Sequence, residues 1–232
     1  MKIGIVGIAG AGKDTFAKML QQELWRIGRI EKPVLIKRYA YALKKSAELA
    51  FGTAFDDRDV KDVPVAVTIH KKHLAPAGLE AKLADLAALY GAEVKADKFT
   101  CTSSPAQFQQ YLGTEVGRAV SETYWMDLYN STCTDEVYIA PDVRFGNELE
   151  NSDFNVLIVN PKAKGRPGHV SEAMAEHMTD VFANSTEQEW EDEHFNIQYT
   201  VLNAYSLRHL QQQAQKVAHL IVVHMKDELK WD

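Results

Sequence analysis

The string GIAGAGKDT at residues 7–15 constrains the fold of this chain more than any other segment. It follows a short apolar run, Ile3 to Val6, of the kind that forms a strand buried on both faces of a parallel sheet. From about Thr15 to Ile27, apolar residues recur at the spacing of an amphipathic helix. A glycine-rich turn between a buried strand and a helix is typical of an α/β protein that binds an anion at that turn.

Each part of this turn has a physical use at an anion. Glycine permits positive φ and lets the backbone approach an oxyanion closely, while successive N–H groups and the helix N-terminus supply partial positive charge. Lys13 adds a mobile ammonium for the β- and γ-phosphates of a nucleotide. We therefore predict a phosphate-binding loop, and the alternative is a glycine turn that merely joins strand to helix. The predicted binding residues are Gly10, Ala11, Gly12, Lys13, Asp14 and Thr15.

The loop departs from the strict pattern G-x-x-x-x-G-K-[ST] at one position. Asp14 stands where Ser or Thr is expected, and Thr15 follows one residue late. The looser pattern G-x-x-G-x-G-K-x-T fits fully and resembles that of the nucleoside monophosphate kinases. A carboxylate suits the first turn of a helix, but beside a polyphosphate it needs Mg²⁺ or its water shell in between. We expect Mg²⁺ in any case, because it bridges phosphate oxygens and neutralises developing charge.

The rest of the chain continues the α/β pattern. Strands are predicted over 3–6, 34–36, 137–140, 156–159 and 197–202. A second helix over 42–51, ended by Gly52, implies parallel strands joined by right-handed crossovers. A last helix is expected to follow Ser206 as its N-cap. The predicted fold is a P-loop NTPase-type three-layer α/β sandwich around a central, mainly parallel five-stranded sheet.

We interpret residues 1–232 as a single domain of this type with two additions. Residues 53–100 carry charged and basic stretches and a helix over 79–90, and are interpreted as an insertion on the substrate side. A loop over 161–176 is rich in basic side chains between Gly and Pro residues, and we expect it to act as a lid over polyphosphate. The alternative is a solvated basic loop. Its basic or imidazole residues are Lys162, Lys164, Arg166 and His169.

Composition narrows the range of partners. The 232 residues carry 26 Lys and Arg against 32 Asp and Glu, a formal net charge of −6, which argues against a nucleic-acid polymer as ligand. Cys101 and Cys133 lie outside any CxxC motif and are interpreted as reduced thiols. No apolar run approaches the roughly 20 residues of a membrane span, so we expect a cytoplasmic protein without a membrane partner. A homodimer is left open.

A helical run over about 105–129 is the first candidate for binding a second, anionic substrate. Its i, i+4 spacing predicts that Arg118 and Glu122 share a face. The same spacing predicts that Ser121 and Trp125 share a face. An arginine offers a planar fork to a phosphate, and an indole offers a flat surface to a base. The alternative, which spacing alone favours, is an amphipathic helix with a core tryptophan and a surface ion pair.

The second candidate is the segment after the predicted strand 137–140. A proline follows the strand, so Asp142 is expected where the chain leaves the sheet, at the edge where open α/β sheets bind ligands. There Asp142 would hold Mg²⁺ or its waters together with Thr15. Arg144 would reach the transferring phosphate, and Glu148 would hydrogen-bond a base or sugar. The alternative is a strand-end turn with a surface ion pair.

Several short motifs occur in order along the chain. They are GKDT at 12–15, YAYALK at 39–44, QYLGTE at 110–115 followed by Arg118 and Trp125, DVRFGNE at 142–148, HVSE at 169–172 and N-x-x-S-L at 203–207. Together they resemble the motifs of the bacteriophage-type deoxynucleoside monophosphate kinases. The chain departs from that family where Ser104-Pro105-Ala106 lacks an arginine after the proline, and in a longer stretch between Ser171 and Asn203.

The resemblance implies transfer of the γ-phosphoryl group of ATP to a 2′-deoxynucleoside 5′-monophosphate (dNMP), with Mg²⁺ as cofactor and, for a phage-encoded protein, a place in the host cytoplasm. The catalytic residues would be Lys13, Arg118, Arg144 and Asp142. The acceptor would be bound by Arg118, Trp125, Asp142, Arg144 and Glu148. Two other functions stay open. One is a P-loop kinase for another small phosphate acceptor, such as a dephospho-coenzyme or a sugar acid. The other is a nucleotide-binding switch without an acceptor.

Overall fold

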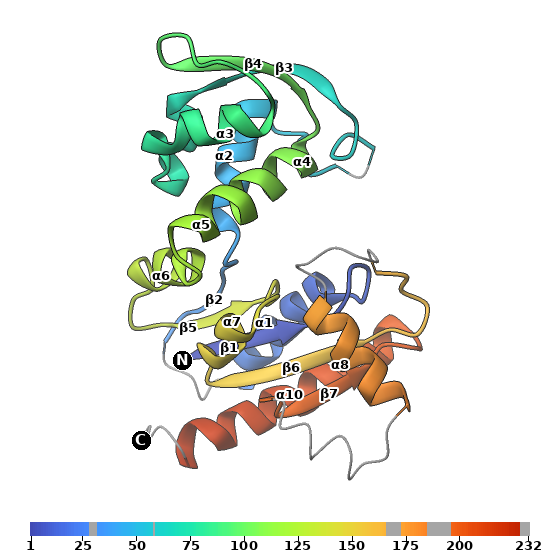
Figure 1. Ribbon diagram of the computed structural model, residues 1–232. Coiled ribbons are helices and arrows are strands. Elements are labelled where there is room, and N and C mark those ends of the chain that lie inside the picture. The colour runs from blue at the N-terminus through green and yellow to red at the C-terminus, as the bar shows by residue number, and fades with distance from the viewer. Residues whose placement is uncertain (28–31, 58, 166–172, 185–195, 228–232) are drawn as a thin grey trace. The chain divides into compact units, whose positions relative to one another are not determined.

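The computed structural model describes residues 1–27, 32–57, 59–165, 173–184 and 196–227. The chain forms two compact units (Figure 1). The first, here called the sheet unit, comprises Met1–Arg38 and Thr132–Asp232. The second, called the inserted unit, comprises Tyr39–Ser131 and therefore interrupts the sheet unit once.

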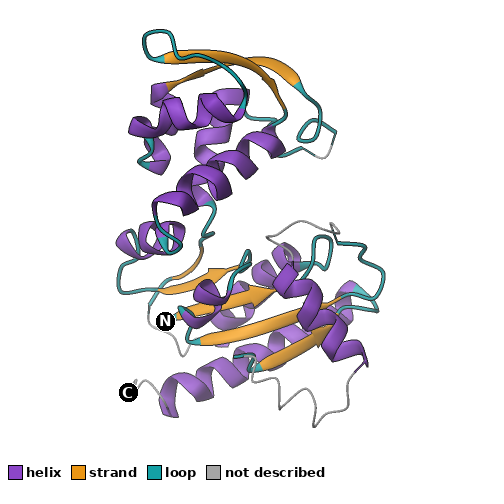
Figure 2. Ribbon diagram, viewed as in Figure 1, coloured by secondary structure: helices purple, strands orange, loops and turns teal. Residues whose placement is uncertain are grey.

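Parallel strands form the sheet of the first unit (Figure 2). They are β1 (Lys2–Val6), β2 (Val34–Ile36), β5 (Val137–Ala140), β6 (Phe154–Val159) and β7 (Tyr199–Leu202). Their order is β2-β5-β1-β6-β7, and every neighbouring pair is parallel. The predicted five-stranded sheet is confirmed. The three inner strands are almost wholly buried because both faces of the sheet are covered.

Helices cover both faces of this sheet. The described ones are α1 (Lys13–Ile27), α7 (Gly146–Glu150), α8 (Ala173–Asn184) and α10 (Leu207–Asp227). Right-handed crossovers toward opposite edges place α1 on one face and α7 and α8 on the other, as Figure 1 shows. Ser206 accepts a hydrogen bond from the N–H of His209 at 3.3 Å, so the predicted N-cap of α10 is confirmed.

The packing of α1 against α10 follows the apolar stripes of their sequences. Phe16, Leu20 and Leu24 of α1 are fully buried, as are residues of α10 at matching helical spacing. Glu23 adds a polar link, because its carboxylate accepts a hydrogen bond from the side chain of Gln211 at 2.7 Å. This interface fixes the helix whose N-terminus carries the glycine loop.

The inserted unit combines a β-hairpin with short helices. The hairpin pairs β3 (Val65–His70) with β4 (Lys98–Ser103) in antiparallel register. The helical elements are α2 (Tyr41–Phe51), η1 (Lys71–Ala77), η2 (Glu80–Lys82), α3 (Leu83–Leu89), α4 (Pro105–Gln110), the π-helix η3 (Tyr111–Gly117), α5 (Arg118–Val120) and α6 (Tyr124–Ser131). The unit is wider than the predicted insertion over 53–100, because α2 and the helices after β4 bury their apolar side chains in it.

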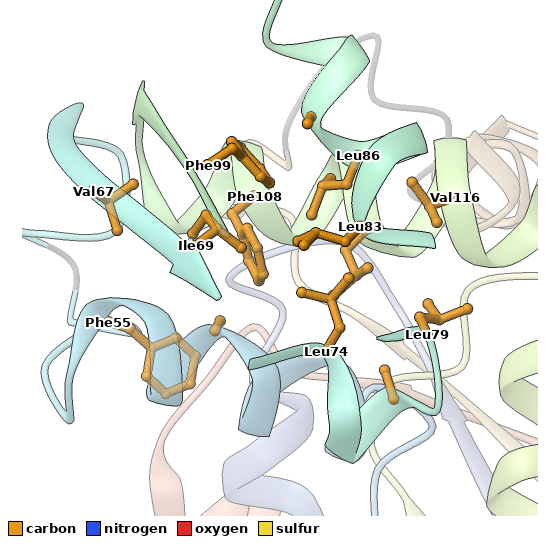
Figure 3. Close-up of a cluster of buried hydrophobic side chains, with 14 of the residues drawn as sticks. Phe55, Val67, Ile69, Leu74, Leu79, Leu83, Leu86, Phe99, Phe108 and Val116 are labelled. Atoms are coloured by element: carbon orange, nitrogen blue, oxygen red, sulfur yellow. The ribbon is translucent and has the colours of Figure 1, made fainter. Parts of the chain in front are cut away.

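The core of the inserted unit draws side chains from the hairpin and from the helices (Figure 3). Ile69 and Phe99 come from the two strands of the hairpin, and Phe108 comes from α4. Leu74 of η1 and Leu86 of α3 belong to the same cluster. Each of these five side chains is at most 2% exposed. The unit thus has the separate hydrophobic core that a compact folding unit requires.

Cys101, opposite Val67 in the hairpin, provides a test of this packing. Burial raises the pKa of its thiol from 9.0 to about 11. Because thiolate is the reactive form, alkylation of the Cys133→Ser variant, whose remaining thiol is Cys101, should reach half of its maximal rate near pH 11. In denaturant the alkylation rate of the same variant should reach half of its maximum near pH 9.0, the ordinary pKa of the thiol. A folded-state midpoint near the denatured one would contradict the partial burial of the Cys101 side chain.

Candidate phosphate-binding site

The loop between β1 and α1 has the backbone conformation that the sequence predicts. Gly10 has φ of 82° and Gly12 has φ of 100°, both in the left-handed region that favours glycine. The N–H of Ala11 donates to the carbonyl of Ile8 at 3.1 Å, which closes a tight turn. The N–H of Phe16 donates to the carbonyl of Gly12 at 2.9 Å and begins the helix. The glycine turn therefore leads directly into the N-terminus of α1, where partial positive charge collects.

Lys13 lies folded against its own loop. Its ammonium donates to the carbonyl of Gly7 and to that of Ile8, the latter at 2.9 Å. An anion that binds here has to draw the ammonium from these carbonyls to its own oxygens. These two neutral carbonyls thus hold the Lys13 side chain at the loop.

Asp14 forms an ion pair with Arg38, which follows β2 by two residues. Both side chains are partly exposed, so the pair contributes little to stability. It does neutralise the carboxylate that occupies the position of Ser or Thr in the strict pattern. Sequence reasoning missed Arg38. Its only signal was a basic residue just beyond a predicted strand.

The parallel order of the sheet brings the segments that follow its strands to one edge. Gly4 of β1 is paired with Ala140 of β5, so Asp142 lies two residues beyond the paired position, as Val6 does in β1. Loops after β6 and β7 end at the same edge, because all five strands point the same way. Open α/β sheets bind ligands at this carboxyl edge. Asp142 is half-buried there, two residues beyond the end of β5.

The side chain of Glu148 is buried and has a local hydrogen-bond partner. Its carboxylate accepts a hydrogen bond from the backbone N–H of Arg144 at 2.8 Å, and only 4% of its surface is exposed. The expected contact from Glu148 to a base or sugar is therefore not supported in this structure. The carboxylate instead holds the turn that carries Arg144, whose own side chain is exposed.

The donor set at this edge fits a Mg²⁺ ion that brings its own phosphates. Thr15 offers an exposed hydroxyl in the first turn of α1, and Asp142 offers a carboxylate. Mg²⁺ in nucleotide sites is held by one or two protein oxygens, by water and by phosphate. Within the described ranges, His, Cys, Asp and Glu do not form a group of three that could hold a metal. Thr15 and Asp142 are therefore the candidate ligands.

Trp125 and Arg118 lie in the inserted unit. Trp125 is 6% exposed, and its indole N–H donates to the carbonyl of Gly113 at 2.7 Å. Its ring belongs to the core, which agrees with the alternative interpretation and not with an open surface for a base. The predicted face-sharing pairs, Arg118 with Glu122 and Ser121 with Trp125, are wrong. The helix α5 ends at Val120, and the backbone of the next residue, Ser121, is extended with φ of −161° and ψ of 139°.

The basic loop after β6 is described only at its beginning. Ala163 lies beside the glycine loop, since a Cβ built on Gly10 would be 3.8 Å from the Cβ of Ala163. Lys162 and Lys164 are exposed in this segment. Residues 166–172, which include the predicted Arg166 and His169, lie outside the described residues. The last four residues of the predicted lid, 173–176, form the first turn of α8.

No family model matches this chain, and no curated protein matches it. Among solved structures, the chain is similar to the structure of pnob8 ParA, with 16% sequence identity and a TM-score of 0.34. The alignment covers 99% of this chain and 73% of that one. Among helices in the described part of the chain, none has the length and apolar character of a membrane span.

A substitution of Trp125 separates its two interpretations. If the indole is a core group, Trp125→Phe should lower the free energy of unfolding by about 1–3 kcal/mol, because the carbonyl of Gly113 loses a buried donor. The KM for any nucleotide acceptor should then change less than twofold. Urea denaturation and steady-state kinetics measure the two effects. A large rise in KM with unchanged stability would restore the base-stacking interpretation.

Proposed function

We propose that this chain is an ATP-dependent deoxynucleoside monophosphate kinase. The observation that carries the proposal is the loop between β1 and α1, where positive-φ glycines and Lys13 stand at the N-terminus of a 15-residue helix. Asp142 adds support, because it follows the strand that pairs directly with β1. The choice of a dNMP as acceptor rests on the resemblance of the ordered sequence motifs.

In the proposed reaction the glycine loop binds the triphosphate of ATP. Backbone N–H groups and the N-terminus of α1 favour negative charge at this point. Lys13 would exchange the carbonyls of Gly7 and Ile8 for β- and γ-phosphate oxygens. The ammonium keeps hydrogen-bond partners before and after the exchange, so the exchange leaves no buried donor unsatisfied.

Mg²⁺ bound with ATP would supply charge neutralisation for the transferring phosphoryl group. Thr15 and Asp142 would hold it, directly or through water. Asp14 does not need the metal to offset its charge, because Arg38 already does so. The basic loop that begins at Lys162 would exclude water from the reaction.

The acceptor phosphate needs cationic partners that hold it in line with ATP. Arg144 has a planar guanidinium group that suits phosphoryl oxygens, and we assign the clamp to it together with Lys13. Glu148 is a positioning residue in this scheme, because it holds the backbone N–H of Arg144. A monophosphate oxygen is a competent nucleophile at neutral pH, so the reaction requires no general base.

A coupled assay of ADP release tests the proposed activity against its alternatives. The four dNMPs and their ribose counterparts are each added with Mg²⁺ and ATP, and at least one dNMP should stimulate ADP release strongly. Stimulation by a dephospho-coenzyme or a sugar acid alone would move the chain to another class of kinase. Slow hydrolysis of ATP without stimulation by any of these compounds would favour a nucleotide-binding switch.

Lys13 should be indispensable for phosphoryl transfer. Lys13→Ala removes the ammonium from the transferring phosphate and should lower kcat/KM by about a thousandfold or more. Lys18→Ala is the matched control, because Lys18 is an exposed lysine on the same helix. The control should keep kcat/KM within about twofold and both variants should keep the wild-type melting temperature within about 2 °C. Near-wild-type turnover in Lys13→Ala would refute the clamp.

A further inference from the structure

Asn203 connects the last strand of the sheet to the middle of the glycine loop. It directly follows β7, and its backbone N–H donates to the carbonyl of Val159 at 2.7 Å, at the end of β6. Its side-chain Nδ2 donates to the carbonyl of Ala11 at 2.8 Å. The two bonded residues are 192 positions apart in sequence. A single side chain thus ties the far end of the chain to the loop that carries the proposed phosphate site.

This hydrogen bond fixes the direction of one loop N–H. In a trans peptide the C=O and the following N–H point in opposite directions. Because the carbonyl of Ala11 faces Asn203, the N–H of Gly12 points away from Asn203. The other side of Gly12 is also held, since its carbonyl accepts the first hydrogen bond of α1, from Phe16. The peptide groups on both sides of Gly12 are therefore set before any ligand arrives.

The space around Gly12 shows the same close fit. A Cβ built on Gly12 would lie 2.5 Å from Nδ2 of Asn203, which is closer than real Cβ atoms approach. The amide of Asn203 therefore occupies the volume that any side chain at this position would need. Position 12 requires glycine for two reasons: its φ is positive, and the amide of Asn203 leaves no room for a Cβ.

We infer that Asn203 is a positioning residue of the phosphate loop: it acts through the Ala11–Gly12 peptide and aims the Gly12 N–H at the polyphosphate. The inference rests on the proposed function of the loop. Asn203 differs from Lys13 in what it does when an anion binds. The ammonium of Lys13 has to leave its carbonyls, whereas the bond from Asn203 to Ala11 stays in place and keeps the loop in its binding shape.

Calorimetric titration of the full chain with Mg²⁺-ATP, and separately with inorganic tripolyphosphate, tests the inference. Tripolyphosphate has no base or sugar, so it reports on the loop alone. Asn203→Ala should weaken the binding of both ligands by about tenfold, because a misaimed N–H loses a charge-assisted hydrogen bond. Asn203→Asp, which keeps the shape but turns a carboxylate toward the Ala11 carbonyl, should weaken both further. In kinetics the loss should appear mainly in the KM for ATP.

Gln21→Ala is the matched control. Its side-chain Nε2 also donates to a backbone carbonyl, that of Val34, at 2.8 Å in a partly buried setting of the same unit. This variant loses the same kind of bond and should bind both ligands within about twofold of wild type. Asn203→Ser, too short to reach Ala11, replaces Asn203→Ala should the alanine variant fail to fold.

The outcomes separate the inference from the proposed function. Wild-type binding of both ligands, kept unchanged in the folded Asn203 variants, would overturn the role of Asn203 and leave the nucleotide site intact. Equal weakening in Gln21→Ala would show a general loss of structure and would also overturn it. A wild-type chain that binds neither ligand would remove the proposed function, and the positioning role with it.

Discussion

The parallel pairing of β1 with β5 on one side and β6 on the other is the constraint on which the candidate site depends. Parallel strands end at the same edge, so the glycine loop, Asp142 and Asn203 meet there despite their distance in sequence. The strands that impose this are buried on both faces, and α1 and α10 pack together on one of those faces. Burial of apolar side chains is non-directional, but it fixes these strands, and the strands place the polar groups at one edge.

Both charged side chains of the glycine loop, Lys13 and Asp14, have partners within the chain. Lys13 is held by loop carbonyls, and Asp14 is held by Arg38. A partly exposed ion pair of this kind adds at most about 1 kcal/mol to stability. Its larger effect is on a ligand, because an unpaired carboxylate beside Lys13 would repel a polyphosphate. Arg38, two residues beyond β2, thus offsets the charge that Asp14 brings to the loop.

The sheet unit could be predicted from sequence because its signals are local. The apolar run predicts β1, the glycines predict the loop, and the apolar stripes at helical spacing predict α1 and α10. The hairpin of β3 and β4 was not predicted, since its pairing of Val65 with Ser103 joins distant positions and its strands lie among charged residues. For the same reason Arg38 and Asn203 were missed as neighbours of the loop. Their partners are set by the order of strands, which no short-range pattern contains.

The motif around Gly113 shows how packing can produce a spacing that looks like a binding pattern. Residues 111–117 form a π-helix, and the indole N–H of Trp125 donates to the carbonyl of Gly113. A Cβ on Gly117 would lie 2.6 Å from the indole ring, so glycine there lets the ring approach the backbone closely. The two glycines and the tryptophan therefore form one structural unit. Arg118 follows directly on this element, at the start of α5.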